Sequence, residues 1–112
     1  MRLKFFLLLI YLTFLKLTFA SVRIIEKGEI ITVENDILRF TIDLKNGARI
    51  SEYFYKPFDE NIVYPISSAG GMLMDHVWEQ IWPGEFLNRK YEYRIIKNTP
   101  EEASISVWTI GN

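Results

Sequence analysis

The stretch ILRFTID at residues 37–43, followed one residue later by KNG at residues 45–47, specifies the architecture of this chain. Apolar and polar residues alternate in the stretch. A β-strand would therefore carry Leu38, Phe40 and Ile42 on one face and the polar residues on the other. An Asn-Gly pair accepts the positive φ angles of a tight hairpin turn. We therefore expect the chain to reverse at residues 45–47.

The residues after this turn predict an antiparallel partner strand. Residues 48–55, ARISEYFY, follow the turn directly and are rich in β-branched and aromatic side chains. Paired with the first strand, they would direct Ala48, Ile50 and Phe54 toward the core. The two segments together form the central hairpin of the expected fold.

Further strand patterns lie on both sides of this hairpin. They cover residues 29–34, 62–64, 91–97 and 103–109, and turn residues such as glycine, proline and asparagine separate them. No long helical pattern interrupts them. Short strands about ten residues apart are typical of antiparallel all-β domains, so we expect an all-β fold, an antiparallel β-sandwich.

The first twenty residues have the pattern of a secretory signal helix. Arg2 and Lys4 precede an almost uninterrupted apolar run at residues 5–15, and small residues precede a possible cleavage site before Ser21. At about 1.5 Å per residue, the run covers only roughly half of the hydrocarbon core of a bilayer. We expect cleavage, with an uncleaved membrane anchor as the alternative.

The rest of the chain, residues 21–112, is the expected folded unit, and it would be secreted, periplasmic or held at the cell envelope. It would touch a membrane only through residues 1–20, if these are not removed. The chain stops directly after a strand pattern. We therefore expect residues 21–112 to be the N-terminal part of a longer, supersandwich-like domain that is incomplete here, with a natural end at Asn112 and an edge strand as the alternative.

Charge and cysteine content exclude several classes of function. The first twenty residues hold three of the 13 basic residues and none of the 14 acidic ones, so the exported part is net acidic. A polyanion would require the opposite sign, and we expect no nucleic-acid partner. The absence of cysteine excludes disulfides, thiolate zinc sites and a cysteine nucleophile.

Residues 75–85, DHVWEQIWPGE, hold the only histidine and two of the three tryptophans. Apolar sugar faces stack on indole rings, and carboxylates and imidazoles bind hydroxyl groups, so this composition indicates a carbohydrate site. The carbohydrate-binding candidates here are Trp82, Trp78, His76, Glu79 and Glu85. His76 is also the candidate general acid or base, because its pKa lies near neutrality.

Structural roles compete with this interpretation. Trp78 and Trp82 lie four residues apart and could close one end of a sandwich, and a single histidine is often structural. His76 and Glu79 have a spacing that binds metals in helical bundles, but one histidine is too few for a site built by this chain alone. We expect no metal and no cofactor.

Residues 34–42 and 46–52 together resemble the first hairpin of galactose-mutarotase-like domains, the aldose-1-epimerase supersandwich group. The resemblance covers about residues 29–65. It implies that Arg89, which follows Asn88, corresponds in order to a sugar-binding arginine of that group, although Gly84-Glu85 replaces the Gly-Arg pair of the family pattern. It also implies that the main catalytic histidine and glutamate come from later strands, beyond this chain.

These observations favour an exported carbohydrate-binding or carbohydrate-active β-sandwich protein whose partner is a sugar or glycan. The chain would be an N-terminal portion without the main catalytic residues. If the whole protein is an enzyme, the resemblance implies a sugar epimerase, a lyase or a glycoside hydrolase. The alternative is a non-catalytic β-module for envelope adhesion or protein interaction.

Overall fold

A computed structural model describes residues 21–66, 70–73, 81–82 and 84–111 of the chain. The strands in this part are β1 (Arg23–Lys27), β2 (Ile30–Glu34), β3 (Leu38–Asp43), β4 (Arg49–Tyr55), β5 (Glu60–Asn61), β6 (Glu92–Asn98) and β7 (Ala103–Trp108). Two short 3-10 helices join them, η1 (Leu44–Asn46) and η2 (Lys56–Phe58). The expected signal helix at residues 1–20 lies outside the described residues.

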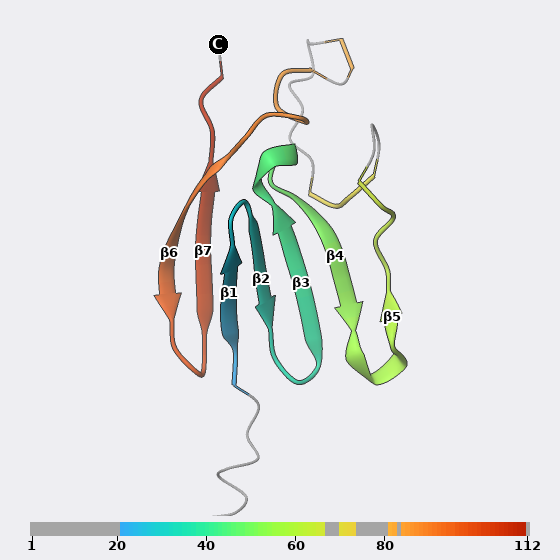
Figure 1. Cartoon of the computed structure of the whole chain (residues 1–112), viewed down its shortest axis with the longest axis vertical. Coiled ribbons are helices and arrows are strands. Elements are labelled where there is room, and N and C mark those ends of the chain that lie inside the picture. Colours follow the sequence, from blue (N-terminus) through green and yellow to red (C-terminus); the bar gives the residue numbers. More distant parts are fainter. Residues whose placement is uncertain (1–20, 67–69, 74–80, 83, 112) are drawn as a thin grey trace, which may run out of the picture.

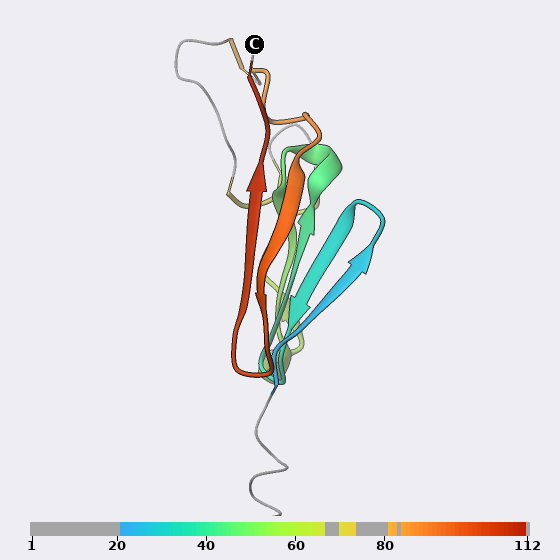
Figure 2. The same ribbon diagram turned by 90° about the vertical axis from the view of Figure 1, so that its left-hand side faces the viewer.

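The strands form two antiparallel sheets. One is five-stranded in the order β1-β2-β3-β4-β5, and the other is the hairpin β6-β7. In Figure 1 the hairpin lies beside β1, with β7 on the inner side, and Figure 2 shows it as a separate layer. The all-β, antiparallel, sandwich-like architecture expected from the sequence is confirmed.

The core lies between the two sheets. Its buried members are Ile31, Ile42, Leu44 and Tyr91, and partly buried Ile24, Phe40, Ala48, Tyr93 and Ile105 pack against them. Ile31 lies opposite Ile42 in the ladder between β2 and β3, so the two side chains share a face. The predicted apolar face of β3 is therefore the face that meets the second layer.

The reversal after β3 differs from the expected tight Asn-Gly hairpin. β3 and β4 do pair, but η1 connects them, and both Gly47 and Ala48 have positive φ angles of 75° and 51°. Leu44 explains the difference. Its side chain is buried, its N–H donates to the Glu29 carbonyl (3.0 Å), and its carbonyl accepts from the Tyr91 N–H (2.8 Å). With Leu44 held by these contacts, the chain forms the 3-10 helix η1 between β3 and β4 in place of a two-residue turn.

The expected core position of Phe54 is wrong. The ladder between β3 and β4 shifts between Thr41 and Ile42, so that Ile42 faces Ile50 whereas Arg39 faces Phe54. This β-bulge adds one residue to β4. Beyond the bulge, the residues of β4 therefore point to the opposite face from the one that simple alternation predicts. Phe54 consequently lies on the polar face.

Two further strand expectations differ from the structure. Instead of the strand expected at residues 62–64, the structure has the two-residue β5, which ends at Asn61, just before the expected strand would begin. The side-chain Oδ1 of Asn61 accepts hydrogen bonds from the N–H groups of Tyr53 (3.0 Å) and Val63 (3.2 Å), where a ladder would continue. β1 was not predicted at all, and it pairs with β2 through a two-residue turn that begins at Gly28 with φ 61°.

Candidate functional site

The candidate carbohydrate site is described only in its second half. His76, Trp78 and Glu79 lie outside the described residues, whereas Trp82, Glu85 and Arg89 lie inside them. These three residues follow one another in the turn segment that leads toward β6. Within the candidate site, the structure therefore describes only residues 81–82 and 84–89.

Trp82 lies at a turn whose backbone is closed by a hydrogen bond. The Gly84 N–H donates to the Ile81 carbonyl at 2.8 Å, and Gly84 has a φ of 74°. The Trp82 side chain is 49% exposed and its neighbour Ile81 is almost fully exposed. A tryptophan exposed to this extent leaves part of its surface open to a ligand.

Leu87 anchors this segment to the fold. Its side chain is fully buried, and the Gly47 N–H donates to the Arg89 carbonyl at 2.8 Å. A Cβ atom placed on Gly47 would lie only 2.4 Å from the Leu87 carbonyl oxygen, so only glycine permits this approach. The turn after β3 thus holds the segment that carries Trp82.

Glu85 and Arg89 form an ion pair beside this turn. The Arg89 Nη2 lies 3.5 Å from Glu85 Oε2, and both side chains are about a quarter exposed. The guanidinium also lies 6.0 Å above the Phe86 ring and donates to the Ile110 carbonyl. The pair presents fixed donors and acceptors of the kind that hydroxyl groups bind.

Arg49 is a structural residue that the sequence did not single out. It is 1% exposed, and its guanidinium donates to the carbonyls of Asn46 (2.9 Å) and Gly70 (2.7 Å) and to Asn88 Oδ1 (3.4 Å). Burial lowers the pKa of Arg49, and nearby Asp43 partly opposes this. Arg49 lies opposite Asp43 in the ladder between β3 and β4, and three loops close over its guanidinium.

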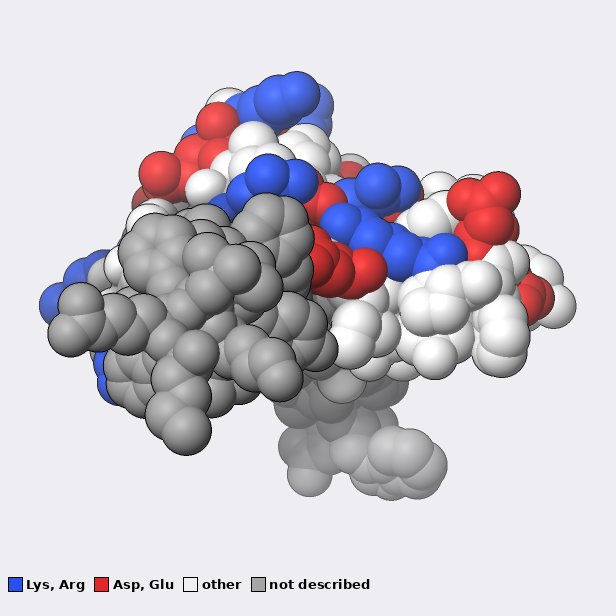
Figure 3. All heavy atoms as spheres, turned by 90° about the horizontal axis from the view of Figure 1, so that it is seen from below, with Lys and Arg blue, Asp and Glu red and all other residues white. Residues whose placement is uncertain are grey.

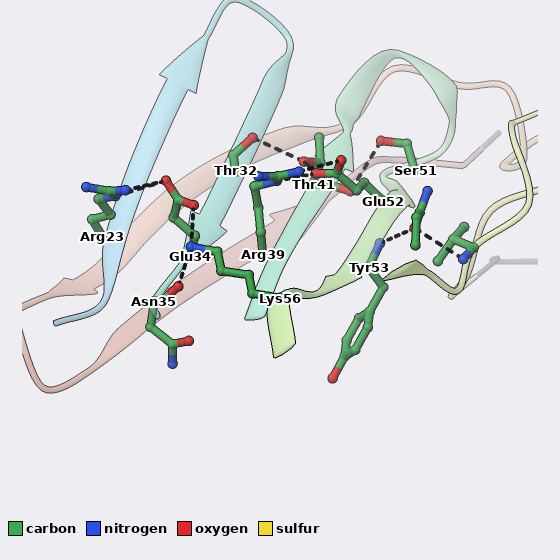
Figure 4. A network of polar contacts seen from close by, with 12 residues as sticks. Arg23, Thr32, Glu34, Asn35, Arg39, Thr41, Ser51, Glu52, Tyr53 and Lys56 are labelled. Carbon is green, nitrogen blue, oxygen red and sulfur yellow. Dashed lines mark hydrogen bonds and ion pairs between the residues drawn. The ribbon is translucent and has the colours of Figure 1, made fainter. Parts of the chain in front are cut away.

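The opposite face of the five-stranded sheet carries a polar network (Figure 4). Glu34 is buried between two cations, with Arg23 Nη2 at 2.8 Å and Lys56 Nζ at 3.0 Å. The hydrogen bond from Lys56 is the main reason that the pKa of Glu34 is lowered. Lys56 also donates to the Asn35 carbonyl at 2.6 Å, so the network ties η2 to the end of β2.

Arg39 and Glu52 form the second part of this network. Arg39 Nε and Nη2 donate to the two carboxylate oxygens at 2.8 and 3.2 Å, and the guanidinium lies 4.6 Å from the Phe54 ring centroid. The Thr41 hydroxyl also donates to Glu52 at 3.2 Å. Arg39 lowers the pKa of Glu52. Because these groups satisfy one another, this face is primarily structural.

Charges of both signs are interleaved on the described residues of the face seen in Figure 3. Within the described part of the chain, no cluster of three or more histidine, aspartate or glutamate side chains could hold a metal ion. The same part contains no helix long and apolar enough to cross a membrane. The described part of the candidate site offers an ion pair, between Glu85 and Arg89, and an exposed aromatic residue, Trp82.

Comparison of the chain with family models, curated proteins and solved structures returned no match.

Proposed function

We propose that this protein is an exported, carbohydrate-binding β-sandwich protein, whose β3-β4 hairpin is similar to the first hairpin of the galactose-mutarotase-like group. The site would be the turn segment that includes Trp82, Glu85 and Arg89. The observation that carries the proposal is the half-exposed indole of Trp82, which lies three residues before a fixed carboxylate–guanidinium pair.

The chemistry of sugars supports this assignment. A pyranose ring has an apolar face that stacks on an aromatic ring and equatorial hydroxyl groups that need directional partners. Trp82 would supply the stacking surface, and Glu85 and Arg89 the partners. Anchoring through Leu87 and Gly47 keeps these side chains on a rigid base, which limits the entropy lost on binding.

The proposal is tested with a glycan array followed by titration of the best glycan against tryptophan fluorescence. Trp82→Ala should weaken binding by about 1–3 kcal/mol, by analogy with the stacking of nucleobases on aromatic side chains. It should change the free energy of unfolding by less than about 1 kcal/mol, because the side chain is half exposed. Tyr64→Ala, which removes an exposed aromatic ring outside this segment, is the matched control and should leave binding unchanged.

Two results would overturn the proposal. One is the absence of any glycan that perturbs tryptophan emission. The other is a loss of about 3–5 kcal/mol in the unfolding free energy of Trp82→Ala, which would show that Trp82 fills the end of the sandwich.

A further inference from the structure

The guanidinium of Arg49, at the start of β4, binds three separate loops. Its Nε donates to the Asn46 carbonyl at 2.9 Å, its Nη1 to the Gly70 carbonyl at 2.7 Å, and its Nη2 to Asn88 Oδ1 at 3.4 Å. The residue is 1% exposed. A buried cation is costly unless hydrogen bonds replace those lost from water, so the positions of the guanidinium and of the three loops depend on one another.

Two of these loops flank the segment that carries the candidate carbohydrate site. Gly70 precedes Trp82 and Glu85 in the chain, and Asn88 follows them, directly before Arg89. One side chain therefore holds the chain on both sides of the candidate site.

On the side before the segment, the chain lies directly on β4. The N–H groups of Ile50 and Met72 each donate to the other residue's carbonyl, at 2.9 and 3.0 Å, as an isolated antiparallel bridge. A Cβ atom placed on Gly71 would lie only 3.1 Å from the Cβ of Arg49. This close approach places the Gly70 carbonyl within reach of the buried guanidinium.

On the side after the segment, Arg49 acts by two routes. It binds the Asn88 side chain directly, next to Arg89. It also holds the carbonyl of Asn46, the last residue of η1, and the following residue, Gly47, donates its N–H to the Arg89 carbonyl at 2.8 Å. The backbone at Arg89 is therefore held from two directions.

We propose that Arg49 is a positioning residue of the carbohydrate site, whose guanidinium joins the loops on both sides of the segment and thereby fixes Glu85 and Arg89 relative to the sheet. Arg49 touches no sugar and acts through Asn88 and Gly47. The proposal rests on the carbohydrate-binding function proposed above. If the segment holds its binding arrangement for only a fraction of the time, the apparent affinity falls by that fraction.

The first test is hydrogen exchange of the full chain without ligand. Arg49→Lys keeps the charge, but an ammonium lacks the planar fork that reaches three separated acceptors. The amides of Gly47 and Arg89 should exchange about tenfold faster or more, because hydrogen bonds to a charged group contribute at least that factor. The amides of β2 and β3 should accelerate less, because they report global unfolding.

Two further variants locate the effect. Arg39→Lys is the matched control, because Arg39 also donates through two guanidinium nitrogens but lies in the polar network of the outer face. It should leave exchange at Gly47 and Arg89 unchanged. Asn88→Ala removes one acceptor of Arg49 from an exposed residue, so it should fold normally and accelerate the Arg89 amide by about threefold. This variant keeps the test decisive if Arg49→Lys does not fold.

The second test is binding. The probe is cellotetraose, whose ring hydroxyl groups are equatorial, or the array glycan with the largest fluorescence response if cellotetraose gives none. Arg49→Lys should raise the dissociation constant about tenfold, as expected if the segment holds its binding arrangement for about a tenth of the time. Arg39→Lys should leave the dissociation constant unchanged.

Three results would overturn the proposal, and they separate it from the proposed function. Equal acceleration of all amides by Arg49→Lys would show that Arg49 stabilises the whole fold and does not position the segment. Unchanged glycan affinity in Arg49→Lys would exclude the positioning role while carbohydrate binding stands. A chain of unaltered sequence that binds no glycan would end both proposals, even with the expected exchange pattern.

Discussion

On the inner face of the five-stranded sheet, Ile31 and Ile42 pack against a second layer, whereas on the outer face Glu34 and Glu52 are held by Lys56, Arg23 and Arg39. The inner face gains from removal of apolar surface from water, a contribution that involves no titrating group. The outer face gains from ion pairs and hydrogen bonds that are partly solvated. One sheet therefore places its apolar and its electrostatic contributions to stability on opposite faces.

The largest expected effect tests the inner face. Ile31→Ala removes three carbons from a fully buried side chain and should lower the free energy of unfolding by about 4 kcal/mol. Thr32→Ala, one residue along the same strand but on the outer face, should cost about 1 kcal/mol or less through loss of its hydroxyl contact with Thr41. Urea unfolding measures both. Equal losses would contradict the difference between the faces.

The next effect tests the turn that joins the two layers. Gly47→Ala combines a positive φ with a Cβ only 2.4 Å from a backbone oxygen, and should destabilise the fold by about 3 kcal/mol. Gly28→Ala is the matched control, because Gly28 also has a positive φ but no atom within 4 Å of the added Cβ. It should cost about 1 kcal/mol. Thermal unfolding of the two variants separates the steric clash with Leu87 from the cost of a positive φ. Similar losses of unfolding free energy in both variants would contradict the clash at Gly47.

A smaller effect tests the outer face. Glu34→Gln leaves Lys56 and Arg23 without their buried carboxylate and should lower the free energy of unfolding by about 1.5–3 kcal/mol. Glu102→Gln removes an ion pair with Lys97 in which both side chains are about half exposed, and it should cost less than about 1 kcal/mol. Denaturant midpoints provide the comparison. A larger loss of unfolding free energy for Glu102→Gln than for Glu34→Gln would contradict the prediction that the buried ion pair contributes more than the exposed one.

The smallest effect is a pH dependence confined to the outer face. The pKa values of Glu34 and Glu52 are lowered from the ordinary 4.5, so the folded chain holds these protons less tightly than the unfolded chain. Their stabilisation is therefore complete above the unfolded pKa and is lost as the pH falls through the lower, folded values. Urea unfolding between pH 7 and about pH 3 should show this decrease, and the double variant Glu34→Gln, Glu52→Gln should flatten it. An unchanged slope in the double variant would show that other carboxylates dominate.

Much of the strand pattern could be predicted from local sequence. The alternation through Leu38, Phe40 and Ile42 identified the inner face of β3, because side chains of a strand alternate between its two faces. The same rule failed at Phe54, since a β-bulge depends on how two strands meet and leaves no clear mark in either one alone. β1 was missed because its hydrophobic pair, Ile24 and Ile25, follows an apolar leader and shows no alternation.

The candidate site was predicted only in part. Glu85 and Arg89 lie four residues apart, and the structure brings them together as an ion pair. The proposed roles of His76, Trp78 and Glu79 stay predictions. The burial of Arg49 could not have been predicted, because its partners Asn46, Gly70 and Asn88 are brought together only when three loops close over it.

By itself, the sequence determined the all-β class, the order of most strands, the face of β3 that is buried and the need for glycine at position 47. These follow from side-chain alternation and backbone sterics, which act over a few residues. Only the tertiary structure decided that Gly47 touches the backbone of Leu87 and that Glu34 is enclosed by cations from β1 and η2. Those features depend on contacts between segments far apart in the chain, and a local pattern carries no record of them.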